Sequence, residues 1–294
     1  MKKVINIFVI VIMFGLFLSL SACNFVNEKQ TGNEITKTYE AKDGINELEI
    51  KEIRIKRGNS TYGPKLSIKK GDTKEIKITM QESLESKISV SYSSDKLSIS
   101  GEYMKTYEVD YDVVISITGY VFEDVGLHNA VECTMDNGTI NTDKVEFQLS
   151  GASSVKLDNG TSKELNVTLS GASSFVITTI SSEKNHFKFS GASTSNISKI
   201  ESKDIDIDFS GASIINLTGT VTNVDAQLSG ASTIGTYEFV CDDFDCELSG
   251  ASNAELTVNK TIRGSVSGAS TIKYKGNASS TVSTSGGSSV THVN

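Results

Sequence analysis

The sequence predicts an all-β fold built from stacked coils, a β-solenoid with about 20 residues in each coil. The first observation is a four-residue repeat, Ser-Gly-Ala-Ser, that starts at Ser150 and recurs in steps of 18 to 20 residues. The second is that apolar and polar residues alternate on both sides of almost every copy. A fixed period near 20 residues is typical of stacked coils, and strict alternation is typical of strands.

The repeat occupies most of the second half of the chain. Intact copies begin at Ser150, Ser170, Ser190, Ser210, Ser229, Ser249 and Ser267, and an altered copy, Ser-Gly-Gly-Ser, begins at Ser285. A degenerate copy lies upstream, with His128 in the place of the first Ser and Asn129 in the place of Gly. Asn tolerates the left-handed conformation that Gly adopts readily. We therefore expect nine coils between about residue 120 and the C-terminus.

The residues around each copy indicate what one coil contains. When the first Ser is counted as zero, apolar residues fall at −3 and −1 and again at +5 and +7, for example Val167, Leu169, Phe175 and Ile177. This pattern predicts a short strand on each side of the motif, with room for a third short segment. Because Gly permits a positive φ, the motif itself is expected to form the corner. The alternative is an outward ladder of Ser hydroxyls that contacts a ligand.

Residues 1–22 have the composition of an export signal. Lys2 and Lys3 precede an apolar run, and Leu20-Ser21-Ala22-Cys23 resembles the lipobox of bacterial lipoproteins. The resemblance implies a lipoprotein signal peptide over 1–22 and a lipid on Cys23, with acyl chains such as palmitate that hold the protein on a membrane. An ordinary cleaved signal and an uncleaved anchor are the alternatives. The expected location is the extracellular face of the cell membrane, or the outer membrane or periplasm in a Gram-negative bacterium.

The rest of the chain divides by composition. Residues 23–42 are polar and are expected to form a tether. Residues 43–118 alternate without the motif and predict irregular β coils that cap the N-terminal end. Residues 119–294 form the repeated solenoid, so that 43–294 is one continuous domain. Its last coil is rich in Ser, Thr and Gly. We expect this polarity to keep the protein monomeric, with end-to-end pairing as the alternative.

Charge and cysteine content exclude several classes of function. The chain has 28 Lys and Arg against 36 Asp and Glu, a net charge of −8, which argues against binding nucleic acid. Besides Cys23, the cysteines are Cys133, Cys241 and Cys246. Their spacing does not resemble a zinc site. Cys241 and Cys246 either form a disulfide or act, like Cys133, as small apolar residues of the interior.

Acidic residues gather at the outward positions −6, −4 and −2 of three successive coils. We call this set the acidic stripe: Asp204, Asp206, Asp208, Asp225, Asp243, Asp245 and Glu247. If the coils stack, all seven carboxylates share one face and repel one another. Three interpretations remain open at this point. The stripe is a solvated acidic face, a binding site for Ca²⁺, or a surface for a basic partner. Ca²⁺ is the one cofactor that the sequence suggests.

The sequence contains no constellation typical of catalysis. His128, His186 and His292 belong to different coils, and the many Ser residues are explained by the motif. Parallel β-helices also occur in polysaccharide-processing enzymes, whose clusters of charged residues lie in grooves made by long loops. The nearly constant period leaves no room for such loops, and Lys and Arg are absent from the acidic stripe itself. We therefore expect no enzymatic activity.

The chain resembles a known family over roughly residues 45–294. The serial Ser-Gly-Ala-Ser motifs, the Leu that precedes several of them (Leu149, Leu169, Leu228) and the ending Ile272-Lys273-Tyr274-Lys275-Gly276 are similar to the adhesin-like head GIN domain family, DUF2807, a relative of the DUF4097 adhesin-like domains. The resemblance implies a right-handed parallel β-helix on secreted or surface-anchored bacterial proteins. It implies no established activity, ligand or functional residue.

Two functions follow as expectations. The first is a lipid-anchored, adhesin-like binding module that contacts a glycan or a surface protein. The second is a structural or accessory protein of the cell envelope without a ligand of its own. Fold alone does not decide between them.

Overall fold

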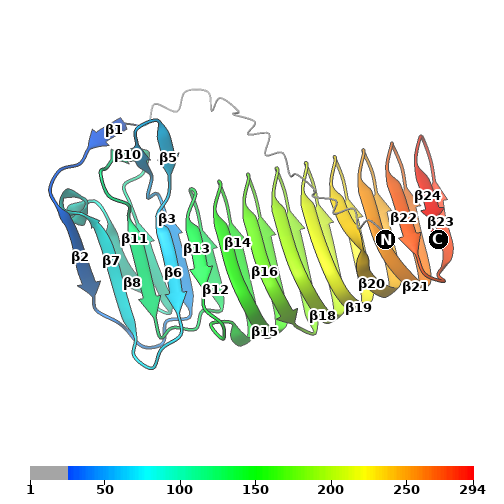
Figure 1. Ribbon diagram of the computed structural model, residues 1–294, viewed down its shortest axis with the longest axis horizontal. Helices are drawn as coiled ribbons and strands as arrows, with labels where there is room; N and C mark the ends of the chain where they lie inside the picture. Colours follow the sequence, from blue (N-terminus) through cyan, green and yellow to red (C-terminus); the bar gives the residue numbers. More distant parts are fainter. Residues whose placement is uncertain (1–25) are drawn as a thin grey trace, which may run out of the picture.

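The computed structural model describes residues 26–294, which form an elongated stack of coils with an irregular β head at its N-terminal end (Figure 1). The predicted signal peptide, residues 1–22, and the predicted lipidation site, Cys23, lie outside the described residues. Within residues 26–294 the regular elements are strands apart from one 3-10 helix, Glu82–Ser86, so the all-β prediction is confirmed. That part of the chain holds no helix long and apolar enough to cross a membrane.

The strands fall into a head and a solenoid. The head contains β1 (Val26–Lys29), β2 (Glu34–Tyr39), β3 (Glu47–Lys51), β4 (Ile55–Arg57), β5 (Ser60–Tyr62), β6 (Lys65–Lys69), β7 (Glu75–Gln81), β8 (Ser89–Ser93), β9 (Lys96–Ser100), β10 (Lys105–Glu108) and β11 (Val114–Thr118). The solenoid contains β12 (Asp124–Leu127), β13 (Glu132–Met135), β14 (Asn141–Leu149), β15 (Ser154–Leu169), β16 (Ser174–Ser181), β17 (Lys184–Phe189), β18 (Thr194–Phe209), β19 (Ile214–Leu228), β20 (Thr233–Leu248), β21 (Asn253–Val266), β22 (Thr271–Lys275), β23 (Ser279–Thr284) and β24 (Ser289–His292).

Consecutive coils pair in parallel, with each residue opposite its counterpart one period away. Ile207 of β18, for example, lies opposite Ala226 of β19, which lies opposite Cys246 of β20. The strands are longer than the sequence predicts, because β15, β18 and β20 each run for 16 residues from one corner to the next. In these coils a single bent strand therefore replaces the two short strands and the third segment that the sequence predicts. Nine corners, from His128 to Ser285, enclose about eight turns.

The corner geometry confirms the role predicted for the motif. Gly211 has φ +77°, and a Cβ there would meet the carbonyl oxygen of Gly191 at 2.4 Å. The backbone N–H of Ala212 donates to that same oxygen at 2.7 Å, which joins each corner to the one before it. Asn129, in the degenerate copy, has φ +68°, so it fills the Gly position as expected.

The Ser hydroxyls of the motif are used inside the corner. Ser213, the last residue of its motif, is fully buried, and its Oγ donates to the carbonyl oxygen of Ser210 at 2.8 Å. The first Ser points to the preceding coil, as where Ser229 Oγ donates to Phe209 O at 3.2 Å. These hydroxyls donate to the protein's own backbone, which supports the structural role of the motif over a ligand-contacting Ser ladder.

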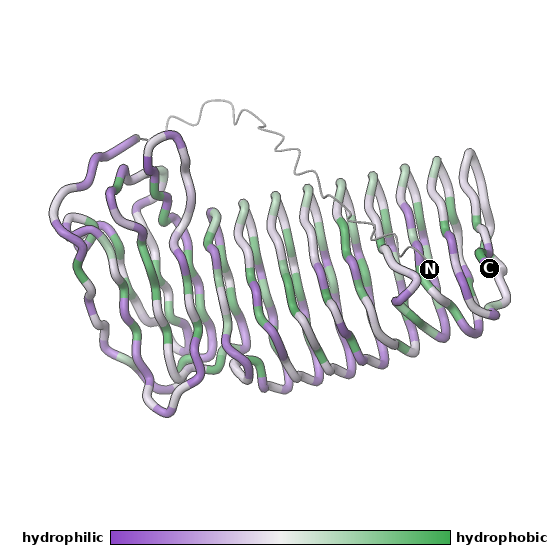
Figure 2. Tube along the Cα trace, in the orientation of Figure 1, coloured by the Kyte–Doolittle hydropathy of each residue, from purple (hydrophilic) through white to green (hydrophobic). Residues whose placement is uncertain are grey.

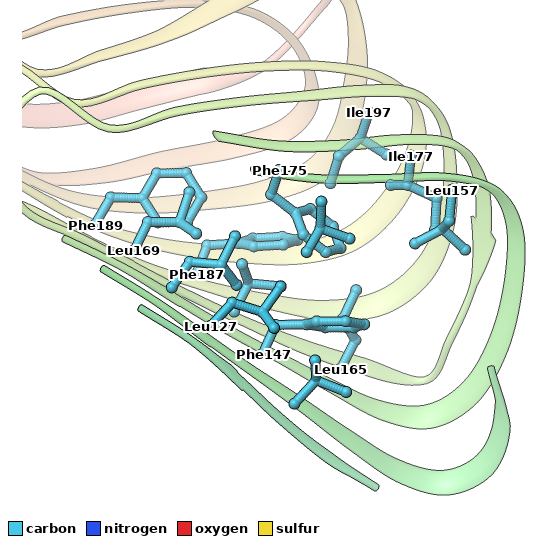
Figure 3. Packing of buried hydrophobic residues seen from close by; sticks show 14 of the residues in the cluster. Leu127, Phe147, Leu157, Leu165, Leu169, Phe175, Ile177, Phe187, Phe189 and Ile197 are labelled. Carbon is cyan, nitrogen blue, oxygen red and sulfur yellow. The ribbon is translucent and has the colours of Figure 1, made fainter. Parts of the chain in front are cut away.

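The interior of the solenoid is a set of apolar columns. Side chains at −3, −1, +5 and +7 point inward as predicted in most coils, and Figure 3 shows several of them filling the space between the faces. The last coil differs, since Thr284 and His292 are exposed there. Two further columns were not predicted, at −5 (Leu165, Ile205) and at +10 (Ile180, Ile200). Phe189 and Phe209 stack with their ring centroids 4.5 Å apart. Hydrophobic and hydrophilic residues alternate along the coils (Figure 2).

The head begins the stack and closes its N-terminal end. Strands β3 and β6 pair in parallel with β12 and β13, so the two solenoid faces continue into the head. Beyond them the pattern becomes irregular, since β11 lies between β6 and the antiparallel β7. β2 then pairs with β7, and β8 pairs with β9, both antiparallel. This arrangement agrees with the irregular N-terminal cap that the sequence predicts.

The predicted tether, residues 23–42, is wrong over most of its described part. Strand β1 pairs in parallel with β10, and β2 pairs along its whole length with β7. Ile35 and Tyr39 of β2 pack against the core, while its other side chains are polar. An edge strand is held by backbone hydrogen bonds and tolerates polar side chains, so its composition resembled that of a linker.

The predicted alternative of a Cys241–Cys246 disulfide is also wrong. Cys133, Cys241 and Cys246 are all free and buried. Burial raises the pKa of the Cys241 and Cys246 thiols to about 12. The three thiols therefore act as small apolar core residues.

Candidate binding face

The structure brings the acidic stripe together on one outward face, as the period predicts. Asp206, Asp225 and Asp245 lie directly opposite one another on β18, β19 and β20. The columns on either side are mixed, with an amide in the middle coil: Asp204, Asn223 and Asp243 in one, and Asp208, Gln227 and Glu247 in the other. Neighbouring strands are about 4.8 Å apart, so the central column holds three carboxylates at close range.

Basic residues of the adjacent coils border the stripe at both ends. On the N-terminal side, His186 Nδ1 lies 2.9 Å from Asp206 Oδ2, and Lys184 Nζ lies 3.7 Å from the same oxygen. On the C-terminal side, the Arg263 guanidinium donates two hydrogen bonds to Asp245, at 2.8 and 3.1 Å. The sequence already places His186 and Lys188 in the same columns one coil before the stripe, whereas the pairing of Arg263 with Asp245 was not predicted. The signal for this pairing was present, because His186 and Arg263 occupy the same −4 position.

In the column that contains Asp204, Asn223 and Asp243, hydrogen bonds partly compensate the charge of both carboxylates. Asn223 Nδ2 donates to Asp204 Oδ1 at 2.7 Å, and Thr261 Oγ1 donates to Asp243 Oδ1 at 2.5 Å. Asp225 differs, since it makes no hydrogen bond or ion pair with any other side chain in the described range. Partial desolvation raises the pKa of Asp225, and the neighbouring carboxylates raise it further. Glu247 likewise makes no hydrogen bond or ion pair with another side chain in the described range, so Asp225 is distinguished by its raised pKa and its place between Asp206 and Asp245.

A hollow of about 180 Å³ lies over the centre of the stripe. It is lined by Lys184, Asp204, Ile205, Asp206, Asn223, Val224, Asp225 and Asp245. Four carboxylates and one ammonium group leave an excess of negative charge around it. Over residues 26–294, no group of three or more His, Cys, Asp or Glu side chains is placed so that it could hold a metal ion.

The other polar groups singled out by the sequence do not converge. His128 Nδ1 lies 2.6 Å from Ser150 Oγ within the first corners, and burial lowers the pKa of this imidazole. His292 Nε2 donates to the carbonyl oxygen of Gly276 at 2.9 Å in the last coil. His128 also interacts electrostatically with Glu49, whose carboxylate is paired with Lys51 at 2.7 Å, whereas His292 has a backbone carbonyl oxygen as its polar partner.

We predict that Asp225→Asn raises the melting temperature at pH 7 by about 1–2 °C. The raised pKa means that the folded protein holds this proton to a higher pH than the unfolded chain does. The ionised form therefore costs stability above that pKa, and the cost disappears as the pH falls through it. Thermal unfolding at pH 7 and at about pH 3 checks this, because the gain should vanish at the lower pH.

The matched control is Asp158→Asn, which removes one exposed charge far from the stripe. Added salt should also shrink the gain at Asp225, since salt screens interactions between exposed charges. An equal gain from both substitutions, or a gain that persists at low pH, contradicts the account of local repulsion.

Several solved structures resemble this fold over nearly their whole length. The crystal structure of a putative adhesin from Parabacteroides merdae is 15% identical, with a TM-score of 0.65 over 91% of this chain and 99% of that one. A putative adhesin from Parabacteroides distasonis is 16% identical, with a TM-score of 0.67 over 91% and 100%. A putative lipid binding protein from the same species is 12% identical, with a TM-score of 0.67 over 92% and 100%.

These likenesses show a shared fold. Among curated proteins, no sequence matches the chain. The family model described as "Putative auto-transporter adhesin, head GIN domain" matches residues 60–192 and 175–278. The matched ranges include most of the head and nearly all of the solenoid, so the chain belongs to the head GIN domain family of adhesin-like proteins.

Proposed function

We propose that this protein is a lipid-anchored, non-catalytic binding module of the cell surface, which contacts a cationic partner through the acidic stripe. The observation that carries the proposal is the central column, where Asp206, Asp225 and Asp245 are in register and Asp225 has no compensating partner among the described residues. Membership of an adhesin-like family supports a role in binding at the surface. The lipobox-like sequence ending at Cys23 supports the anchor.

The chemistry of the stripe favours a partner that carries amino or guanidinium groups. A row of carboxylates along a rigid solenoid is complementary to a basic patch of a surface protein or to a glycan that contains amino sugars. Such a partner relieves repulsion that the fold otherwise retains. The basic borders, Lys184 and Arg263, limit the contact to about three coils.

The experiment measures binding of residues 26–294 to whole cells, isolated peptidoglycan and a glycan panel, with and without Ca²⁺. The test variant combines Asp206→Asn, Asp225→Asn and Asp245→Asn. The matched control, Asp136→Asn, Asp158→Asn and Glu238→Gln, removes three exposed charges elsewhere on the solenoid. We expect about tenfold weaker binding for the stripe variant and little change for the control, since each exposed pair contributes about 0.2–1 kcal/mol.

The other outcomes are equally informative. Equal losses in both variants contradict a site on the stripe. Binding that requires Ca²⁺ replaces the cationic partner with a metal-mediated contact. Absence of binding to every target favours the structural or accessory function and overturns the proposal.

A further inference from the structure

One turn of the head exposes an aromatic side chain far more than any other part of the described chain. Tyr103 is 76% exposed, whereas the next large hydrophobic residue, Val121, is 45% exposed. Tyr103 and Met104 form the tip of a turn closed by a hydrogen bond from Lys105 N to Glu102 O at 3.3 Å. Met104 has φ +57°, a conformation that is uncommon for a residue with a long side chain.

The fold holds this turn in place from below. Glu102 N donates to the Tyr107 hydroxyl at 3.2 Å, and that hydroxyl donates to Glu102 Oε2 at 3.3 Å. The Tyr107 side chain is fully buried in the core. The exposed tip is therefore attached to a rigid support, which fixes the direction in which Tyr103 projects.

The tip lies where the chain leaves the described structure towards its N-terminus. Strands β1 and β10 are parallel, with Val26 opposite Lys105, so the start of β1 and the tip share one end of the small β1–β10–β4–β5 sheet. Only residues 24 and 25 separate Cys23 from Val26. Three residue steps reach at most about 11 Å, even when fully extended. Any group attached to Cys23 therefore stays close to this end of the head.

The distribution of charge distinguishes the head from the solenoid. Residues 26–122 carry 15 Lys and Arg against 16 Asp and Glu, whereas residues 123–294 carry 11 against 20. A nearly neutral head approaches an anionic membrane with little repulsion, while the acidic solenoid is repelled. Tyrosine is enriched at membrane interfaces because its ring is apolar and its hydroxyl is polar.

We infer that the Tyr103–Met104 tip inserts into the interface of the lipid bilayer beside the anchored Cys23 and fixes the head on the membrane. This inference rests on the lipid anchor of the proposed function. In this arrangement the folded head contacts the membrane directly, without a flexible tether between them. The acidic stripe then begins four coils beyond the first corner, and its coils lie roughly 19–29 Å from that corner at strand spacing.

The test uses the absence of tryptophan from the whole sequence. The full chain, processed in cells and reconstituted into phosphatidylcholine–phosphatidylglycerol vesicles, carries Tyr103→Trp as its single emitter. The control is Ile214→Trp, at another exposed apolar residue, on the solenoid. We expect lipids brominated near the headgroup to quench the emission of the Tyr103→Trp protein, with a blue shift. The Ile214→Trp protein should keep its emission.

Mass spectrometry of the N-terminal peptide reports the lipid on Cys23 independently. A lipidated Tyr103→Trp protein that is not quenched, or is quenched no more than the control, overturns the contact and leaves the anchor standing. An unmodified Cys23 overturns the anchor, and with it the inference that rests on it. Urea unfolding of both variants, compared with the parent chain, establishes that the substitutions leave the fold unchanged.

Discussion

Replacing Gly211 with alanine is expected to destabilise the protein by about 3–5 kcal/mol, which exceeds the effect of most single substitutions. The backbone there has φ +77°, which an alanine adopts only at a cost. The added Cβ would also lie 2.4 Å from the Gly191 oxygen, a backbone atom that cannot rotate away. Relief of this clash requires the corner to move, which weakens the 2.7 Å hydrogen bond from Ala212 N to the same oxygen.

Substitutions at two other glycines distinguish the cost of the positive φ from the cost of the steric clash. Gly44 also has a positive φ, +76°, but a Cβ there would meet nothing within 4 Å. Gly44→Ala should cost about 1 kcal/mol from conformation alone. At Gly235 the nearest atom would be a side-chain carbon at 3.6 Å, so Gly235→Ala should be nearly neutral. Urea unfolding of the three variants gives the ranking, and similar losses at Gly211 and Gly44 would show that close stacking of corners is unimportant.

The second large effect is expected at the stacked aromatic pair of the core. Phe209→Ala should lower the free energy of unfolding by about 3–5 kcal/mol, because it leaves a cavity between coils that cannot close. Phe209 is 1% exposed and lies against Phe189 at 4.5 Å. Thermal and urea unfolding of the variant measures the loss.

The chain itself suggests the control for this substitution. Position −1 is Leu in the next coil, at Leu228, and in the coil before Phe189, at Leu169. Because the columns are structurally equivalent, Phe209→Leu should cost no more than about 1.5 kcal/mol. A loss as large as that of Phe209→Ala would mean that residues at the same position of different coils are not interchangeable.

The solenoid and the stripe were predictable because a strict period converts sequence distance into spatial position. Once Gly211 marks a corner, Asp206 and Asp225 must stack, whatever the details of the strands. Asn185 shows the limit of this reasoning. It occupies the apolar −5 column and is fully buried, with its amide hydrogen-bonded to Ser182 and Ser202 at 2.7 Å. Only the three-dimensional contacts explain how the core accepts it.

The head was less predictable because its pairings do not follow a period. The insertion of β11 between β6 and β7 joins segments far apart in the sequence and mixes parallel with antiparallel pairing. Strand β2 escaped notice because edge strands carry polar residues. The exposed tip at Tyr103 was missed for a related reason, since its exposure depends on the turn that Tyr107 supports. The local sequence reveals neither the pairing of β2 nor the exposure of Tyr103.

The salt dependence of binding tests the central claim, contact through the acidic stripe, most directly. The affinity of residues 26–294 for intact cells is measured at rising salt for the parent protein, the stripe variant and the matched control. The account predicts that the parent and the control weaken together as salt screens the contact, while the weaker stripe variant responds little. Binding by the parent that is indifferent to salt, or a stripe variant that weakens in parallel with the control, would contradict it.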